Sequence, residues 1–95
     1  MINYGSPAAW EYSGEYGEVR FSVELDGRDI LCRVSREAIE DAYGPCPNDD
    51  ARLSRARQHF DQLTDLVGDK ISSGCFEPDE TILLGTRDLR PARPG

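Results

Sequence analysis

The chain has 95 residues, with 18 acidic and 11 basic side chains and a formal net charge of −7. A chain of this length forms one small domain with a small core, and its negative charge disfavours binding to nucleic-acid phosphates or to an anionic membrane surface. Three cysteines and one histidine lack the close spacing of a zinc site, so we expect no metal, and the small core leaves little room for a cofactor.

Residues 1–17 are rich in glycine, serine and aromatic side chains, and we expect an irregular segment there. The segment lacks the cationic start and apolar run of a secretory signal, and no stretch of the chain reaches the 20 or so apolar residues of a membrane span. We therefore expect a cytoplasmic protein. Trp10, Tyr12 and Tyr16 alternate loosely in the segment. They either cover a face of a sheet or form an exposed contact surface, because tryptophan and tyrosine are favoured at interfaces.

Residues 18–25 alternate between apolar and polar side chains, which predicts a half-buried strand. Asp26 and Gly27 suit the two central positions of a type I′ turn, so a hairpin with a second strand follows. This register pairs apolar side chains across the two strands, namely Val19 with Val34, Phe21 with Cys32 and Val23 with Ile30. It also sets like charges opposite each other, Arg20 against Arg33 and Glu24 against Asp29, at a small energetic cost.

Two helices are expected after the hairpin. Ser35 is a suitable N-cap for a short helix that Gly44 ends. Asn48 is a suitable N-cap for a second helix that runs to Gly74. The second helix carries an apolar stripe at 3–4 spacing, made of Leu53, Ala56, Phe60, Leu63, Val67 and Ile71. We expect any bend in this helix at Gly68, because glycine is a poor helix former.

The run Ile82-Leu83-Leu84 predicts a buried strand over residues 81–86. Residues 87–95 have almost nothing to bury and are expected to be a disordered tail. The predicted fold is therefore an α+β domain over residues 18–86. An antiparallel sheet is built on an N-terminal hairpin, two helices pack on one face, and a C-terminal strand returns to the sheet.

The pattern of these elements is similar to the bacterial family catalogued as domain of unknown function 1488, over roughly residues 16–88. The similarity rests on Val19, Phe21, Val23, Asp26-Gly27, Ile30, Cys32, Val34-Ser35, Glu37-Ala38-Ile39, Gly44, Lys70-Ile71, Gly74, Ile82-Leu83-Leu84 and Asp88. The resemblance implies a compact α+β domain in a bacterial cytoplasm. It implies no reaction, and no functional residues carry over from it.

The clearest candidate binding surface lies on one shoulder of the second helix, where four polar side chains gather around Leu66: Arg52, Arg55, His59 and Lys70. This shoulder could bind an acidic peptide, a phosphate or an RNA backbone. It could equally be a solvated flank whose long side chains cover the edge of the core. Arg57 lies on the opposite shoulder, and its spacing predicts an ion pair with Asp61.

The remaining polar groups offer little chemistry. Asp61, Asp65 and Asp69 lie along one side of the helix and cannot surround a cation. Cys32 is expected in the core, and Cys46, between two prolines, is expected to be the exposed thiol. His59 has no recognisable nucleophile near it in the sequence, and no phosphate-binding, hydrolase or metalloprotease motif is present.

These observations favour a non-enzymatic module that binds another protein or a second copy of itself. One alternative is a weak nucleic-acid-linked regulator. Its cations would be Arg52, Arg55, Lys70, Arg87, Arg90 and Arg93. Another alternative is a small thiol-dependent enzyme that uses Cys46.

Overall fold

The hairpin expected from the sequence forms the centre of the sheet. In the computed structural model, which describes residues 2–15 and 17–89, strands β3 (Glu18–Leu25) and β4 (Arg28–Ser35) are antiparallel. All the predicted pairs are confirmed, including Phe21 with Cys32 and Arg20 with Arg33. Asp26 and Gly27 both have positive φ, at 51° and 84°, as a two-residue hairpin turn requires.

Three short strands extend this hairpin into a five-stranded sheet. Strands β1 (Ile2–Asn3) and β2 (Glu11–Ser13) both pair antiparallel with β3, on the side away from β4. Strand β5 (Ile82–Leu84) returns to the sheet as predicted, and it runs parallel to β4, with Cys32 opposite Ile82. The sheet is therefore mixed, although most of its pairs are antiparallel.

The predicted capping residues all lie at helix ends. The Ser35 hydroxyl accepts from the Ala38 N–H at 3.1 Å and caps α1 (Arg36–Tyr43). The Asn48 side chain accepts from the Ala51 N–H at 2.8 Å and caps α2 (Asp49–Gln58). Gly74 ends α3 (Phe60–Ser73) in the left-handed conformation, with φ of 70°.

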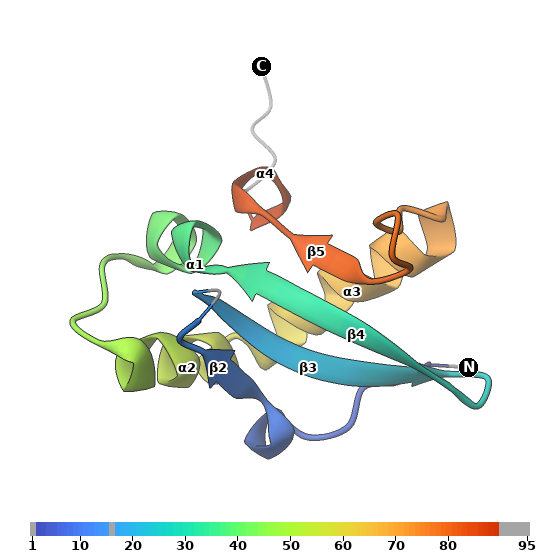
Figure 1. Ribbon diagram of the computed structural model, residues 1–95, viewed down its shortest axis with the longest axis horizontal. Coiled ribbons are helices and arrows are strands. Elements are labelled where there is room, and N and C mark those ends of the chain that lie inside the picture. Colours follow the sequence, from blue (N-terminus) through green and yellow to red (C-terminus); the bar gives the residue numbers. More distant parts are fainter. Residues whose placement is uncertain (1, 16, 90–95) are drawn as a thin grey trace.

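The prediction of one long second helix is wrong, because α2 and α3 are separate helices divided at His59. His59 leaves helical geometry, with φ of −105° and ψ of 28°, and its ring stacks on Tyr43 at 3.7 Å. The break lets α2 pack against α1 and β2 while α3 packs against β5. In Figure 1, α3 crosses behind the strands.

Gly68 lies inside α3, and the chain leaves helical geometry at His59 instead. A Cβ atom on Gly68 would lie 2.6 Å from the Tyr4 hydroxyl oxygen. The glycine therefore allows the N-terminal segment to approach the helix closely.

The N-terminal segment is part of the domain and not an irregular extension in front of it. Besides β1 and β2 it forms a 3₁₀ turn, Pro7–Ala9, whose Ser6 N-cap accepts from the Ala8 N–H. Trp10 is only 1% exposed, and its ring stacks on Phe21 with centroids 4.0 Å apart. Of the two alternatives for Trp10, cover of a face of the sheet is confirmed and an exposed contact surface is wrong, because the ring lies between Phe21 of β3 and Phe60, with a centroid distance of 5.5 Å to Phe60. Tyr16 lies outside the described residues.

The tail also differs from the prediction at its start. Residues Thr86–Leu89 form a single helical turn, α4, and the Leu89 side chain is buried. Burial of this apolar side chain favours the turn, which packs against α1, and the Asp88 carboxylate accepts from the Gly85 N–H at 2.8 Å. Residues 90–95 lie outside the described part of the chain. Within that part, no helix is long and apolar enough to cross a membrane.

Among the described residues, no helix covers one of the two faces of the sheet. The inward side chains of β3 and β4 form the core with α1, α2 and α3, and α3 lies behind the strands in Figure 1. The outward side chains of the same strands alternate with them. We call the outward side the open face, and its residues on β3 and β4 are Glu18, Arg20, Ser22, Glu24, Asp29, Leu31 and Arg33.

Candidate functional site

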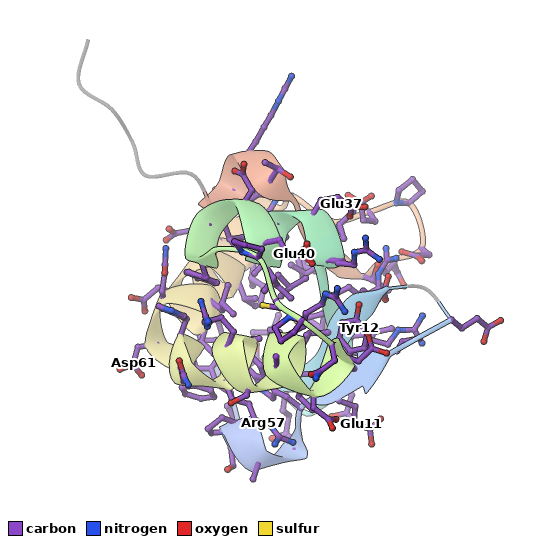
Figure 2. All side chains as sticks on the ribbon, turned by 90° about the vertical axis from the view of Figure 1, so that its left-hand side faces the viewer. Glu11, Tyr12, Glu37, Glu40, Arg57 and Asp61 are labelled. Carbon is purple, nitrogen blue, oxygen red and sulfur yellow. The ribbon has the colours of Figure 1, made fainter. Side chains whose placement is uncertain are left out.

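Arg52 on the predicted shoulder is engaged inside the protein. Its guanidinium donates to Glu40 at 2.8 Å and to Asp49 at 2.7 Å, and the side chain is 12% exposed. It also lies 5.9 Å from the centre of the Tyr12 ring. Burial is the main cause of the raised pKa of Tyr12, which Arg52 partly opposes. Figure 2 labels Tyr12 on β2 and Glu40 on α1, the two side chains that Arg52 contacts from α2.

The other shoulder residues are engaged as well, and at two different places. Arg55 donates to the Tyr43 carbonyl oxygen, and His59 stacks on the Tyr43 ring. Lys70 lies further along α3 and pairs with Asp88 of α4 at 3.1 Å. Arg52, Arg55 and Lys70 thus all contact oxygen atoms of the chain itself. The break at His59 divides the predicted shoulder between α2 and α3.

Tyr43 organises the end of α1. Its hydroxyl donates to the Gln62 side chain at 2.8 Å, and burial raises its pKa to about 12. Together with the contacts of Arg55 and His59, this bond links α1 to α2 and α3.

The prediction that Arg57 pairs with Asp61 is wrong. Arg57 instead donates to the carbonyl oxygens of Trp10 at 2.9 Å and Ala8 at 3.3 Å. It thereby fastens the N-terminal segment to α2. Figure 2 labels Arg57 and Asp61 on separate helices, α2 and α3.

The thiols are arranged differently from the prediction. Cys46 is buried, with its sulfur 3.6 Å from the Gly44 carbonyl oxygen, and Cys75 is the exposed cysteine. In the connector between α1 and α2, the Cys46 carbonyl oxygen accepts from the Arg52 guanidinium at 3.5 Å. Cys32 lies in the core as expected, and burial raises its pKa to about 12. Across residues 2–15 and 17–89, no group of three or more histidine, cysteine or acidic side chains could hold a metal ion.

The open face contains an ion-pair network that the sequence did not indicate. Arg20 and Arg33 lie opposite each other, and the buried Glu18 carboxylate bridges them at 2.7 and 3.5 Å. Arg33 also donates to the Thr81 hydroxyl at 3.3 Å. The repulsion between Arg20 and Arg33 is therefore offset by the Glu18 carboxylate, which lies between the two guanidinium groups.

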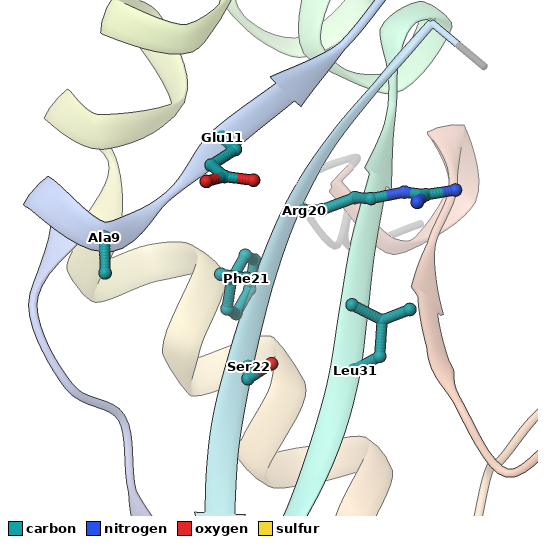
Figure 3. Close-up of a pocket in the computed structure, with 6 residues that line it drawn as sticks. All are labelled: Ala9, Glu11, Arg20, Phe21, Ser22 and Leu31. Carbon is teal, nitrogen blue, oxygen red and sulfur yellow. The ribbon is translucent and has the colours of Figure 1, made fainter. Parts of the chain in front are cut away.

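A hollow opens at the edge of this face. Strand β2 pairs with β3 as far as Arg20, and β1 pairs with β3 from Glu24 onward. The three residues of β3 between these positions have neither strand beside them on this edge. A hollow of about 460 Å³ lies there. We call it the edge notch, and it is lined by Ala9, Glu11, Arg20, Phe21, Ser22 and Leu31 (Figure 3).

A second hollow of about 210 Å³ lies near the hairpin turn, lined by Arg28, Phe76 and Glu80. Phe76 is 37% exposed. This hollow is smaller than the range of about 300–1,000 Å³ typical of ligand sites, so we regard the edge notch as the candidate functional site.

The arrangement defines the class of this protein: a small α+β domain with helices on one side of a mixed sheet and an open face on the other. The fold matches the crystal structure of a protein of unknown function from the domain of unknown function 1488 family of Shewanella loihica PV-4. The TM-score is 0.73 over 79% of this chain and 84% of that chain, with 17% identical residues. The resemblance seen in the sequence is thus confirmed at the level of the fold.

Comparisons by sequence add nothing to the structural match. No protein-family model matches the chain, and no curated protein matches it.

Proposed function

We propose that this chain is a non-enzymatic protein-interaction module that binds its partner through the open face of the sheet. The observation that supports this proposal is the lack of a second layer over β3 and β4 among the described residues. Leu31 and Leu83 are only half-buried there, and Ser22 is exposed. Antiparallel sheets commonly leave one face to solvent. The open face points to a partner because its centre is partly apolar and a notch lies at its edge.

Neither alternative function has a supporting observation. Of the cations that a nucleic-acid-linked regulator would use, Arg52, Arg55 and Lys70 contact oxygens of the chain itself. Arg87 is exposed, and Arg90 and Arg93 lie outside the described residues. A thiol-dependent enzyme would use Cys46, which is buried.

The test is an affinity capture with the tagged full-length chain from bacterial lysate, split into nuclease-treated and untreated halves. We expect a stoichiometric protein in both halves. We also expect Leu31→Glu to remove it, because the substitution places a charge at the centre of the open face. Ser54→Glu is the matched control, since Ser54 is exposed on α2, away from that face.

Two results would overturn the proposal. One is equal capture by the wild-type chain and by folded Leu31→Glu, which would place the interaction elsewhere. The other is capture that disappears with nuclease, which would favour the nucleic-acid alternative.

A further inference from the structure

We propose that the edge notch binds one residue of an extended peptide that carries a cationic side chain. The proposal rests on the proposed function, because it names the partner chemistry at one point of the open face. It combines three features of the notch: a main-chain donor and acceptor, a hollow of suitable size with apolar walls, and a carboxylate at the rim.

The first feature is the main chain of Ser22. In an antiparallel ladder, alternate residues of a strand bond to the neighbour on one side and then to the neighbour on the other. The two-residue turn closes on the pair Leu25–Arg28, so Phe21 and Val23 bond toward β4. Arg20 and Glu24 then bond toward β2 and β1, where their partners are Glu11 and Asn3.

Ser22 has the same orientation as Arg20 and Glu24, but no described strand lies opposite it. Its N–H and C=O groups therefore point into the notch. A residue of an extended peptide presents the complementary N–H and C=O pair, as in recognition by strand addition. Because β1 and β2 occupy the edge on either side, only a single guest residue has room to pair.

The second feature is the size and lining of the hollow. Its volume of about 460 Å³ lies within the range of ligand sites. Ala9 and Leu31 give it apolar walls, which suit the aliphatic stem of a lysine or arginine side chain. Phe21 contributes to the floor, where its ring is held by the stack with Trp10.

The third feature is the charge at the rim. Glu11 is exposed beside the notch, whereas Arg20 is paired with Glu18 at 2.7 Å. Figure 3 shows the Arg20 side chain extending across β4, away from Glu11. Glu24 and Asp29 are exposed further along the same face, and the chain carries a net charge of −7. The notch therefore favours a cationic side chain, and the net charge disfavours a second copy of the chain as the occupant.

The test is an NMR titration of the ¹⁵N-labelled full-length chain with the capped tripeptide acetyl-Val-Lys-Val-amide. We expect a saturable shift of the Ser22 amide signal at millimolar peptide. Acetyl-Val-Glu-Val-amide is the charge control, and the peptide methylated at the lysine main-chain nitrogen is the hydrogen-bond control. Both should bind at least about fivefold more weakly, which is the effect expected from loss of one exposed charge pair or one hydrogen bond.

Two variants locate the binding. Glu11→Gln should weaken the lysine peptide about fivefold, and Ser22→Pro should abolish the saturable shifts around the notch. Proline is tolerated where the N–H faces away from the ladder, so the β3–β4 hairpin should survive, as the remaining signals will show. Asp65→Asn, on the exposed side of α3, is the matched control and should bind like the wild type.

Hydrogen exchange in the free chain tests whether the Ser22 N–H lacks a hydrogen-bond partner there. The Ser22 amide should exchange much faster than those of Phe21 and Val23. A protected Ser22 amide, or equal binding of the lysine, glutamate and N-methylated peptides, would overturn the inference. Shifts at Ser22 that depend on protein concentration alone would identify a second copy as the occupant and would also overturn it.

The two proposals can fail separately. If Ser22→Pro and Glu11→Gln still capture the lysate partner while Leu31→Glu does not, the open face is an interaction surface and the notch is not its peptide site.

Discussion

At the scale of single residues, Trp10 shows how much the core depends on the N-terminal segment. The indole ring stacks nearly parallel to Phe21, at an interplanar angle of 9°. Its Nε1 atom is buried, and no group of the described residues accepts a hydrogen bond from it. Stacking and burial of the ring, rather than the indole N–H, therefore account for the contribution of Trp10 to stability.

This predicts different outcomes for two substitutions of Trp10. Trp10→Ala should lower the free energy of unfolding by about 3–5 kcal/mol, as for other large aromatic side chains in cores. Trp10→Phe leaves a smaller space and should lower it by only about 1 kcal/mol, since it keeps the stack and removes an unpaired donor. Urea unfolding followed by circular dichroism measures both. Equal losses would mean that the N–H has a partner in solution.

The three cysteines should differ in their reactivity. Cys75 is exposed, whereas Cys32 and Cys46 are buried, and the pKa of Cys32 is raised to about 12. The thiolate is the reactive form, so iodoacetamide at neutral pH should label one thiol in the folded chain and three in urea. Mass spectrometry counts the labels. In Cys75→Ser the folded chain should take none, and rapid labelling of that variant would contradict the buried position of Cys46.

At the scale of elements, local signals predicted the hairpin and the capping residues, since each depends on residues close in sequence. Asp26 and Gly27 set the turn, and Ser35 and Asn48 act as caps. The break at His59 could not be predicted, because the apolar stripe continues through it without glycine or proline. At the break the His59 ring stacks on Tyr43, a tertiary contact that the local sequence does not reveal.

Gly68 illustrates the same limit and gives a prediction about α3. Alanine in a helix interior is favoured over glycine by about 1 kcal/mol, but a Cβ atom here would displace the Tyr4 hydroxyl. Gly68→Ala alone should therefore change the free energy of unfolding by less than about 0.5 kcal/mol, the two effects offsetting each other. In a Tyr4→Phe background the same substitution should raise it by about 1 kcal/mol.

A double-mutant cycle by urea unfolding measures this coupling. The same effect of Gly68→Ala in both backgrounds would show that the Tyr4 hydroxyl does not restrict α3.

At the scale of the whole molecule, the stability should fall in alkali. Burial raises the pKa of Cys32 from 9.0 to about 12 and that of Tyr43 from 10.0 to about 12. Both groups hold their protons more tightly in the folded chain than in the unfolded chain. The stability that they contribute is therefore present below pH 9 and is lost as the pH rises toward 12.

Urea unfolding at pH about 8 and about 11, followed by circular dichroism, tests this linkage. The double variant Cys32→Ala, Tyr43→Phe should lose less stability between the two pH values than the wild type does. If it loses as much, other groups cause the alkaline destabilisation.

The overall architecture was predictable from the sequence, but the candidate site was not. The α+β class, the hairpin register and the return of the last strand follow from alternation and apolar runs. The edge notch exists because β1 and β2, of two and three residues, pair with different parts of one strand. Strands this short leave no readable alternation, and the Glu18 bridge needs the sheet to be assembled first.

The parallel pairing of β4 with β5 has a consequence for the order of folding. The hairpin closes over two residues, whereas contacts such as Arg33 with Thr81 join residues 48 positions apart. Closing a long loop costs more chain entropy before any contact forms, so β5 should join after the rate-limiting step. Leu84→Ala should then mainly accelerate unfolding, and Val23→Ala should mainly slow folding, as stopped-flow chevrons would show. Among the described strands, the one that is synthesised last would thus be the one that completes the sheet.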